Sequence, residues 1–301
     1  MQSEQLRYNA YTGHDGGDIG HYPEPDDTPV DADGFRLYLE RGFNCVRPSA
    51  QSASYWLQLR GRSYIESKEG HFVLKPGQWF ALERESAPSI GTDRRGVLIG
   101  FSADPALLAD IERHWRIALL PGEGQLSRSE RLTLARLWRQ CAATLFAAND
   151  RFERQRAFRR LLAGVRDTQS DLALKLRHCP GRRVARQRQV FARLQRMRLF
   201  LRGNIDRLVP MAELADLTSF SPWWISKTFK AVYGDTVQST SVALRIEHAC
   251  DLLTASALSI GEISHACGFD SPCSFARTFR ARMGCTASQY RINPHAKIAQ
   301  V

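Results

Sequence analysis

The sequence of 301 residues predicts an α+β protein, in which a small β-barrel or sandwich with a helical pair precedes an all-α C-terminal part. Three observations support this prediction. Short apolar runs separated by turn residues recur between about residues 34 and 101. The apolar period changes to three and four residues from 105 onward. A helix–turn–helix pattern then occurs twice, at 211–230 and 260–280.

The N-terminal region is expected to begin with a mobile lead-in over 1–30, which is rich in Gly, Asp and Pro. A domain over 31–166 follows. Its candidate strands are the runs FRLYL, SYWLQL, SYIES, HFVL, WFAL and GVLIGF, with turn residues such as Pro76-Gly77 between them. In the second run, the alternation of Tyr55 and Leu57 with their neighbours is typical of a half-buried strand.

Helices are expected after these strands. The segment PALLADIERHW starts at Pro105, and proline is tolerated in the first turn of a helix. Apolar residues recur at three and four positions over 129–148, and a second helix follows over about 151–165. This helical pair is expected either to pack on the barrel or to form a dimer interface. Residues 167–188 are expected to form a basic linker, because they contain the run RRVARQR.

Charge is distributed unevenly along the chain. Residues 1–174 contain 23 Lys and Arg against 23 Asp and Glu, whereas residues 175–301 contain 19 against 8. The net charge of +11 is therefore carried by the C-terminal part. A neutral domain followed by a basic one indicates that the second part binds a polyanion, and nucleic acid is the usual candidate.

Several functional classes are disfavoured. No apolar run is long enough for a membrane span, and the first ten residues do not resemble a signal peptide, so a cytoplasmic protein without membrane contact is expected. The seven cysteines include no CxxC pair, which argues against a zinc site or a disulfide framework. His71 is the only histidine between 22 and 113, which disfavours a metal-dependent enzyme. No cofactor, metal or enzymatic activity is expected.

The two repeats align over their whole length, at an offset of 49 residues that becomes 50 after one insertion near Asp270. Each copy is expected to form a helix, a short turn and a second helix, with Gly268 in the left-handed conformation in the second turn. Ser221 and Ser271 are placed as N-caps, each followed by proline at the first helical position. Residues 241–253 lack helix breakers and are expected to link the two units.

The second helix of each repeat is amphipathic. Ile225 and Phe229, like Phe275 and Phe279, lie four residues apart on one face. The opposite face carries cationic and small polar residues, which are the types that read base edges in the major groove of DNA. These residues are Trp223, Ser226, Lys227 and Lys230 in the first unit, and Cys273, Ser274, Ala276, Arg277 and Arg280 in the second.

At this point the sequence resembles the AraC/XylS family of bacterial transcription regulators, over about residues 190–293. The resemblance rests on LAxLxxFSPWWISKTFKxxYG, on LRIEHACDLL and on ISxACGFDSPxSFARTFRxxMG with the ending SQYR. It implies a DNA-binding domain over 189–301 with two helix-turn-helix units that enter the major groove of promoter DNA. By position, Lys230 and Arg280 resemble phosphate contacts, and the other seven residues resemble base-reading contacts.

The resemblance also implies a transcriptional activator that contacts RNA polymerase, and an N-terminal cupin-like barrel that binds a small-molecule effector or forms a homodimer. The aromatic residues Tyr55, Trp56, Tyr64 and Trp79 are candidates for an effector pocket, and core packing is the alternative for each. Two departures from the family pattern affect local stability. Ala287 replaces a proline, and the segment before the linking helix lacks an aromatic residue.

Three alternatives remain open from the sequence alone. The chain could be an enzyme with a DNA-binding appendage, although the cysteine spacings do not suit a cysteine-based repair protein. It could be an interaction protein whose basic face binds RNA or acidic protein. Thiol sensing through Cys267 or Cys273 is a third alternative.

Overall fold

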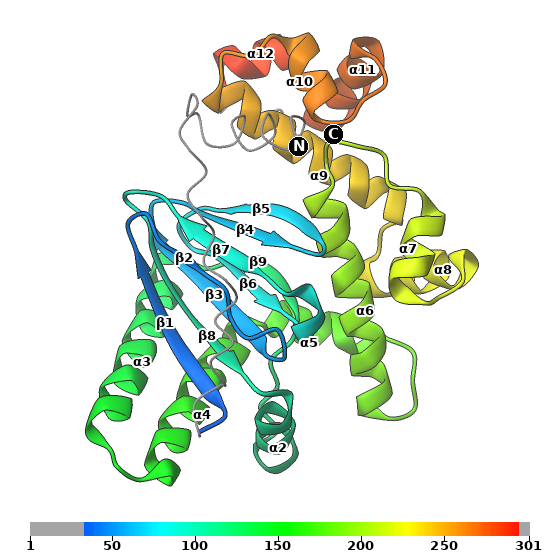
Figure 1. The fold of residues 1–301 in the computed structure, drawn as a ribbon. Coiled ribbons are helices and arrows are strands. Elements are labelled where there is room, and N and C mark those ends of the chain that lie inside the picture. Colours follow the sequence, from blue (N-terminus) through cyan, green and yellow to red (C-terminus); the bar gives the residue numbers. More distant parts are fainter. Residues whose placement is uncertain (1–32, 295–301) are drawn as a thin grey trace.

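The computed structural model describes residues 33–294, so the lead-in expected over 1–30 lies outside the described residues. The molecule is an α+β protein (Figure 1). Its N-terminal strands form two antiparallel sheets. The first sheet has the order β1 (Phe35–Arg41), β8 (Val97–Ala103), β3 (Ala53–Arg60), β6 (Gln78–Leu82) and β9 (Gly122–Gln125). The second has the order β2 (Cys45–Val46), β7 (Ser89–Thr92), β4 (Ser63–Ser67) and β5 (Gly70–Leu74).

The two sheets pack face to face as a sandwich. Trp56, Phe80 and Leu98 from the first sheet meet Ile65 and Phe72 from the second in one apolar cluster. The described strands are not hydrogen-bonded into a single closed barrel. Of the two arrangements that the strand pattern allows, the structure therefore has the sandwich.

Strand β3 differs from the half-buried strand that its alternation predicted. Both faces of β3 are buried, because Trp56 faces the second sheet while Tyr55 and Leu57 pack against helices on the other side. A half-buried strand needs one face in water, and the helical layer removes that face from water. The prediction was wrong at this strand because alternation alone does not reveal a cover contributed by distant residues.

Three helices follow the sandwich close to their predicted positions. They are α2 (Pro105–Trp115), α3 (Arg128–Ala147) and α4 (Arg151–Thr168). The last two form an antiparallel pair beside the first sheet (Figure 1). The ring of Phe158 on α4 stacks on Phe35 of β1, with 4.1 Å between ring centroids. The pair thus packs on the sheet, which was one of the two roles expected for it.

The segment 167–188 is largely helical, although the sequence suggested a linker. It contains α5 (Ser170–Arg177) and the first residues of α6 (Val184–Gly203). Leu172 and Cys179 in this segment are buried in the main core. Helix α6 then contacts β5, β9 and the C-terminal helices, so it connects the two halves of the molecule.

The described residues of the C-terminal part, up to 294, form six helices after α6. They are α7 (Met211–Thr218), α8 (Pro222–Tyr233), α9 (Val237–Ala255), α10 (Ile260–Ala266), α11 (Pro272–Met283) and α12 (Ala287–Ile292). Helix α9 lies between the two helix–turn–helix units (Figure 1). It begins four residues earlier than predicted, because Thr236 caps its N-terminus and Val237 is buried. At about 1.5 Å per residue, its 19 residues extend about 28 Å.

The two helix–turn–helix units are supported by different cores. Leu214, Ile225 and Phe229 of the first unit belong to the same apolar cluster as Phe158 and Phe191 of α4 and α6. The second unit has a separate cluster, which it shares with α9. The first unit is therefore continuous with the N-terminal half, whereas the second is attached through α9.

The sandwich and α6 also meet at a charged junction. The carboxylate of Glu69, in the turn between β4 and β5, is fully buried and pairs with Arg196 at 2.9 Å. The backbones of Gly70 and Gly203 lie so close that a Cβ on Gly70 would be 2.4 Å from the carbonyl oxygen of Gly203. On strand β9, Glu123 pairs with Arg202 of α6 at 2.9 Å.

Among the described helices, none is both long and apolar enough to cross a membrane.

Candidate nucleic-acid interface

The first unit consists of α7, a tight turn and α8. Helix α7 ends at Ser219, which adopts the left-handed conformation at φ 54°. Ser221 then caps α8, since its hydroxyl accepts a hydrogen bond from the backbone N–H of Trp224 at 3.3 Å. Pro222 occupies the first turn, and Gly234 ends the helix in the left-handed conformation. The cap and the proline stand where the sequence predicted them.

The second unit repeats this design with α10 and α11. Glu262 and Ser259 form a capping box at the start of α10. Gly268 adopts φ 67° in the turn, as predicted. Ser271 caps α11 by accepting from the N–H of Ser274 at 3.2 Å, and Gly284 ends the helix. The second helices of the two units have the same caps at the same positions, which shows that the sequence repeat is a structural repeat.

Each second helix buries the predicted face. Ile225 and Phe229 of α8 are fully buried, and so are Phe275 and Phe279 of α11. The predicted groove-facing residues lie on the opposite side. Eight of the nine are exposed, and Ser274 is half-buried; the exposed ones are Trp223, Ser226, Lys227, Lys230, Cys273, Ala276, Arg277 and Arg280.

Two side-chain contacts hold residues on the exposed face of α8 in place. Trp223 is 69% exposed, and the ammonium of Lys227 lies 5.0 Å from the centroid of its ring. The hydroxyl of Ser226 donates to the carbonyl of Pro222 at 3.0 Å, so its oxygen remains available as an acceptor. Together with the exposed Lys230, this face offers two cations, one indole N–H and one hydroxyl to a ligand.

The exposed face of α11 carries two arginines. Within residues 33–294, the guanidinium groups of Arg277 and Arg280 make no ion pair or hydrogen bond. They lie three residues apart, and therefore on one side of the helix. A planar guanidinium without a protein partner can bind a guanine edge or a phosphate in bidentate fashion.

The sequence did not reveal the role of Arg245 on α9. This arginine is buried, and its Nε donates to the carbonyl of Cys267 at 2.6 Å. A second hydrogen bond reaches the carbonyl of Gly268, and the guanidinium lies 4.2 Å from the ring centroid of Phe269. Burial lowers the pKa of Arg245 below the ordinary arginine value. Arg245 thus fixes the turn of the second unit to the linking helix, a role that depends on contacts 22 residues away.

The departure at Ala287 has a local compensation. Ala287 is the first residue of α12, and Thr286 caps this helix in a capping box with Gln289. The side chain of Ala287 is buried in the cluster of the second unit. The helix therefore starts at its expected position without proline.

The four aromatic residues proposed for an effector pocket do not lie together. Tyr55 and Trp79 stack on the helix-covered side of the first sheet, with ring centroids 5.6 Å apart. Trp56 lies between the sheets, beside Tyr38. Tyr64 is half-buried on β4, where it alternates with the inward-facing Ile65. These side chains therefore face three different environments.

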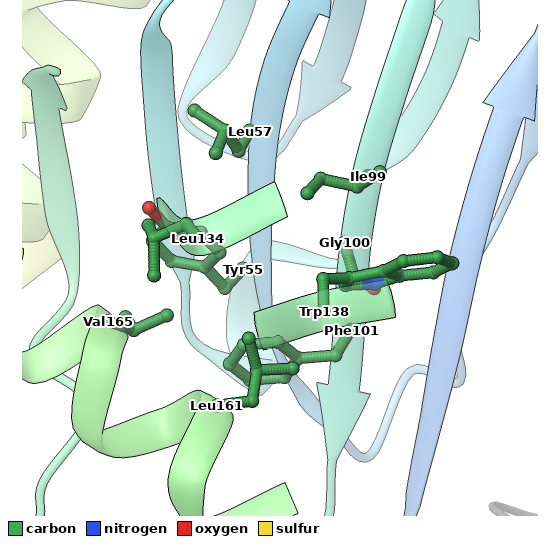
Figure 2. Close-up of a pocket in the computed structure, with 9 residues that line it drawn as sticks. All are labelled: Tyr55, Leu57, Ile99, Gly100, Phe101, Leu134, Trp138, Leu161 and Val165. Atoms are coloured by element: carbon green, nitrogen blue, oxygen red, sulfur yellow. The ribbon is translucent and has the colours of Figure 1, made fainter. Parts of the chain in front are cut away.

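One small cavity lies between the first sheet and the helical pair (Figure 2). Tyr55, Phe101, Leu134 and Val165 point into it from both layers (Figure 2). Its volume is about 10 Å³, which corresponds to about one water molecule. Trp138 closes one side and donates its indole N–H to the carbonyl of Gly100 at 2.9 Å. This space is a packing defect of the core and is too small for an effector.

An open cleft of about 590 Å³ lies at the start of β1, between α2 and α4. Its lining includes the carboxylates of Asp104, Asp110 and Asp150, and the exposed ring of Phe152. Over the part of the chain that the structure describes, no group of three or more His, Cys, Asp and Glu side chains could hold a metal ion.

Comparisons with known proteins match the same C-terminal region of the chain. A family model described as "Helix-turn-helix domain" matches residues 214–293. The chain is 30% identical over 98 residues to the MmsAB operon regulatory protein of Pseudomonas aeruginosa, covering 33% of this chain and 32% of that protein. It is 32% identical over 95 residues to the transposon Tn10 TetD protein of Escherichia coli, covering 32% of this chain and 69% of that protein.

Among solved structures, the C-terminal domain of AraT, a response regulator from Geobacillus stearothermophilus, is similar at 25% identity and a TM-score of 0.33. The similarity covers 36% of this chain and 88% of that one. The matched region thus spans about a third of the Pseudomonas regulator and over two thirds of the transposon protein. The duplicated unit with its caps, the matching family model and the two curated relatives together show that the chain belongs to the AraC/XylS family of transcriptional regulators.

Proposed function

We propose that this protein regulates transcription in the cytoplasm by binding double-stranded promoter DNA at a specific sequence. In this proposal, α8 and α11 each enter the major groove and read base edges. Trp223, Ser226 and Lys227 read bases in the first half-site, while Lys230 contacts phosphate. Arg280 contacts phosphate in the second half-site, where the base-reading residues are Cys273, Ser274, Ala276 and Arg277. The proposal assigns no catalytic step to the chain.

The observation that carries the proposal is that α8 and α11, the capped second helices of the two repeated units, each expose one face. Helix α9 holds the two units, and its length of about 28 Å approaches the ~34 Å between successive major grooves on one side of DNA. The second unit offers unpaired arginines, and the first offers Trp223 and Lys227. A spacing of this size suits two half-sites one helical turn apart.

The test is selection of bound duplexes from a random DNA library with the full-length protein, at two salt concentrations. The expected result is one motif with two blocks about one helical turn apart, recovered at both concentrations. Binding without a motif that weakens steeply with salt would show phosphate attraction alone, and would overturn the proposal. Competition by duplex RNA of matched length distinguishes the proposal from a general polyanion binder.

The sign of regulation and the protein partners form a second part of the proposal. Membership of the family supports activation through contact with RNA polymerase. The helical pair α3–α4 supports a homodimer, because it exposes Leu132, Phe146 and Phe152 after packing its other face on the sheet. Transcription from the selected promoter in a purified system measures the sign. Sedimentation of the wild type against Phe146→Ser measures the dimer, and equal masses would reject this interface.

We also propose that the sandwich is a cupin-like domain that binds a small-molecule effector. The open cleft beside α2 and α4 supports this part, because about 590 Å³ lies within the usual range for small ligands. Its carboxylates favour a cationic or hydroxyl-rich compound. A thermal-shift screen of such compounds should give hits that Asp110→Asn weakens and that Asp171→Asn, a change at an exposed residue of α5, leaves unchanged. Equal loss in both variants would place the ligand elsewhere.

A further inference from the structure

The segment between Asp171 and Asp206 is strongly basic. It contains ten Lys and Arg residues and no Asp or Glu. The structure places these residues at the end of α5, in the loop before α6 and along α6 itself. The proposed recognition helices do not use any of them. Whether each of these side chains can bind a ligand depends on whether it faces an acidic residue of the protein.

Eight of the nine arginines of this segment fall into two groups, and the ninth, Arg198, packs against the ring of Tyr233. Those that face the N-terminal half are paired with acidic residues: Arg188 with Glu112, Arg196 with Glu69, and Arg202 with Glu123. A second group has no acidic partner within the described residues; its members are Arg177, Arg182, Arg183, Arg186 and Arg193. The first four of this group are exposed. We call these five residues the α6 basic group.

Helix α6 runs alongside the first helix–turn–helix unit. Arg193 donates from Nη1 to the carbonyl of Thr218 at 3.0 Å and lies 5.1 Å from the ring centroid of Phe220, just before α8 begins. Five residues later, Arg198 lies 5.0 Å from the ring centroid of Tyr233, the last residue of α8. The order of these contacts shows that α6 and α8 run in the same general sense.

The first part of α6 therefore extends past the N-terminal end of α8. Nine residues precede Arg193 in α6, which corresponds to about 13 Å at 1.5 Å per residue. In helix-turn-helix proteins the N-terminal residues of the recognition helix contact base edges, so this direction leads to the DNA. Arg186 lies seven residues before Arg193 on the same side of α6, and Arg182 and Arg183 precede it in the loop.

The opposite end of α6 points to the second unit. A Cβ on Gly268 would lie 2.7 Å from the backbone of Asp206 and Arg207, which follow α6. The N-terminal end of α6 is therefore the end far from the second unit. Figure 1 shows the same arrangement, with α10–α12 beyond the upper end of α6 and the loop before α6 at its lower end.

We propose that the α6 basic group binds the DNA phosphates that flank the first half-site on the side away from the second half-site. This inference rests on the proposed function and adds a third contact element to the two recognition helices. Guanidinium groups without an acidic partner can bind phosphate oxygens and release counterions. These contacts would extend the footprint and carry no base preference.

The test compares the full-length wild type with the variant Arg182→Gln/Arg183→Gln/Arg186→Gln. The control removes the same charge from exposed arginines of the sandwich, as Arg62→Gln/Arg94→Gln/Arg95→Gln. Fluorescence anisotropy with the selected duplex measures the dissociation constant between 50 and 300 mM KCl. Each lost phosphate contact reduces the slope of log Kobs against log[salt] by about 0.9. The expected reduction is about 2 to 3 for the α6 variant and below 1 for the control.

A second measurement uses altered DNA and does not depend on the folding of a variant. Neutral methylphosphonates replace the phosphates that flank the first block of the motif on its outer side. Wild-type binding is expected to weaken about tenfold, and weakening at the inner flank is expected to be smaller. The α6 variant, if it melts at the wild-type temperature, is expected to lose little further affinity on the outer substitution.

The outcomes separate this inference from the proposed function. Wild-type protein that selects no motif would overturn the proposed function and this inference with it. A motif with equal salt slopes for the α6 variant and the control, and no effect of the outer methylphosphonates, would overturn the inference alone. A change of preferred sequence in the α6 variant would also contradict it, because phosphate contacts carry no base information.

Discussion

Gly234 and Gly268 adopt nearly the same left-handed backbone in the two units, at φ 76° and φ 67°. Their surroundings differ. A Cβ on Gly234 would meet no atom within 4 Å, whereas one on Gly268 would lie 2.7 Å from the backbone of Arg207. The two positions therefore separate the cost of the backbone conformation from the cost of steric contact.

We expect Gly234→Ala to lower the free energy of unfolding by about 1 to 2 kcal/mol, the cost of a left-handed alanine. Gly268→Ala should lower it further, because the turn and the segment after α6 must move apart. Urea denaturation of both variants measures the difference. Equal losses of the free energy of unfolding would show that the segment after α6 moves away from the added Cβ without further destabilisation. The close approach at Gly268 would then not matter for stability.

Arg277 is the side chain whose role in DNA recognition is easiest to isolate. It is exposed, and no acidic residue among those described pairs with it. We expect Arg277→Ala to weaken binding of the selected duplex by about 1 to 3 kcal/mol and to relax preference at one base pair. Anisotropy titrations with duplexes varied at each position measure both effects. Arg282→Ala is the matched control, because Arg282 donates to Ser239 on α9 instead. Unchanged affinity and preference for Arg277→Ala would exclude a base contact.

At the scale of elements, the junction between the sandwich and α6 contains a carboxyl group with a raised pKa. Burial, together with the carboxylates of Glu85 and Glu69, raises the pKa of Glu83 to about 7, although Arg196 opposes this shift. Glu83 occupies the N-cap position of the short 3₁₀ turn Arg84–Ser86 that leads into β7, without a side-chain cap hydrogen bond. Because the folded state holds this proton more tightly than the unfolded state, its contribution to stability is complete below about pH 4.5 and is lost as pH rises through about 7.

Glu83→Gln should abolish this loss. The variant is expected to match the wild type at pH 4 and to exceed its free energy of unfolding by about 1 to 3 kcal/mol at pH 8. Urea denaturation across this range provides the measurement, with exposed Glu66→Gln as the control. Parallel profiles for Glu83→Gln and the wild type would mean that Glu83 is ionised in the folded protein at neutral pH.

For the whole molecule, the shared core determines where the chain can be divided. The sequence suggested a DNA-binding domain over 189–301, but α6 begins at Val184, and Leu172 and Cys179 of the preceding segment are buried in the cluster that holds Ile225 and Phe229. A cut at 189 removes the start of α6 and all of α5. The first unit then loses buried contacts that the second unit does not need.

We therefore expect a fragment of residues 170–301 to melt at a higher temperature than one of residues 189–301, and to bind the selected duplex more tightly. Calorimetry and anisotropy measure these properties. In the shorter fragment, amide hydrogen exchange should be faster in α7–α8 than in α10–α11, since the second unit keeps its own cluster. Equal melting temperatures would show that α5 contributes nothing to the first unit.

The sequence by itself determined the features that depend on neighbouring residues. The caps at Ser221 and Ser271, the left-handed Gly268 and the faces that bury Phe229 and Phe279 follow from local spacing, and the structure contains each of them. The nine groove-facing candidates could be named because a helix with one buried face exposes the other. Short strands such as β2, β7 and β9 were missed, because few residues carry their pattern.

Only the tertiary structure decided the contacts between distant residues. Burial of both faces of β3 and attachment of Arg245 to the carbonyl of Cys267 depend on which elements cover which. The direction of α6 is another such feature, and it divides a continuous basic run into arginines that pair with Glu69, Glu112 and Glu123 and arginines that do not. Local periodicity sets the face of a helix, but the three-dimensional packing of the whole chain sets what that face meets.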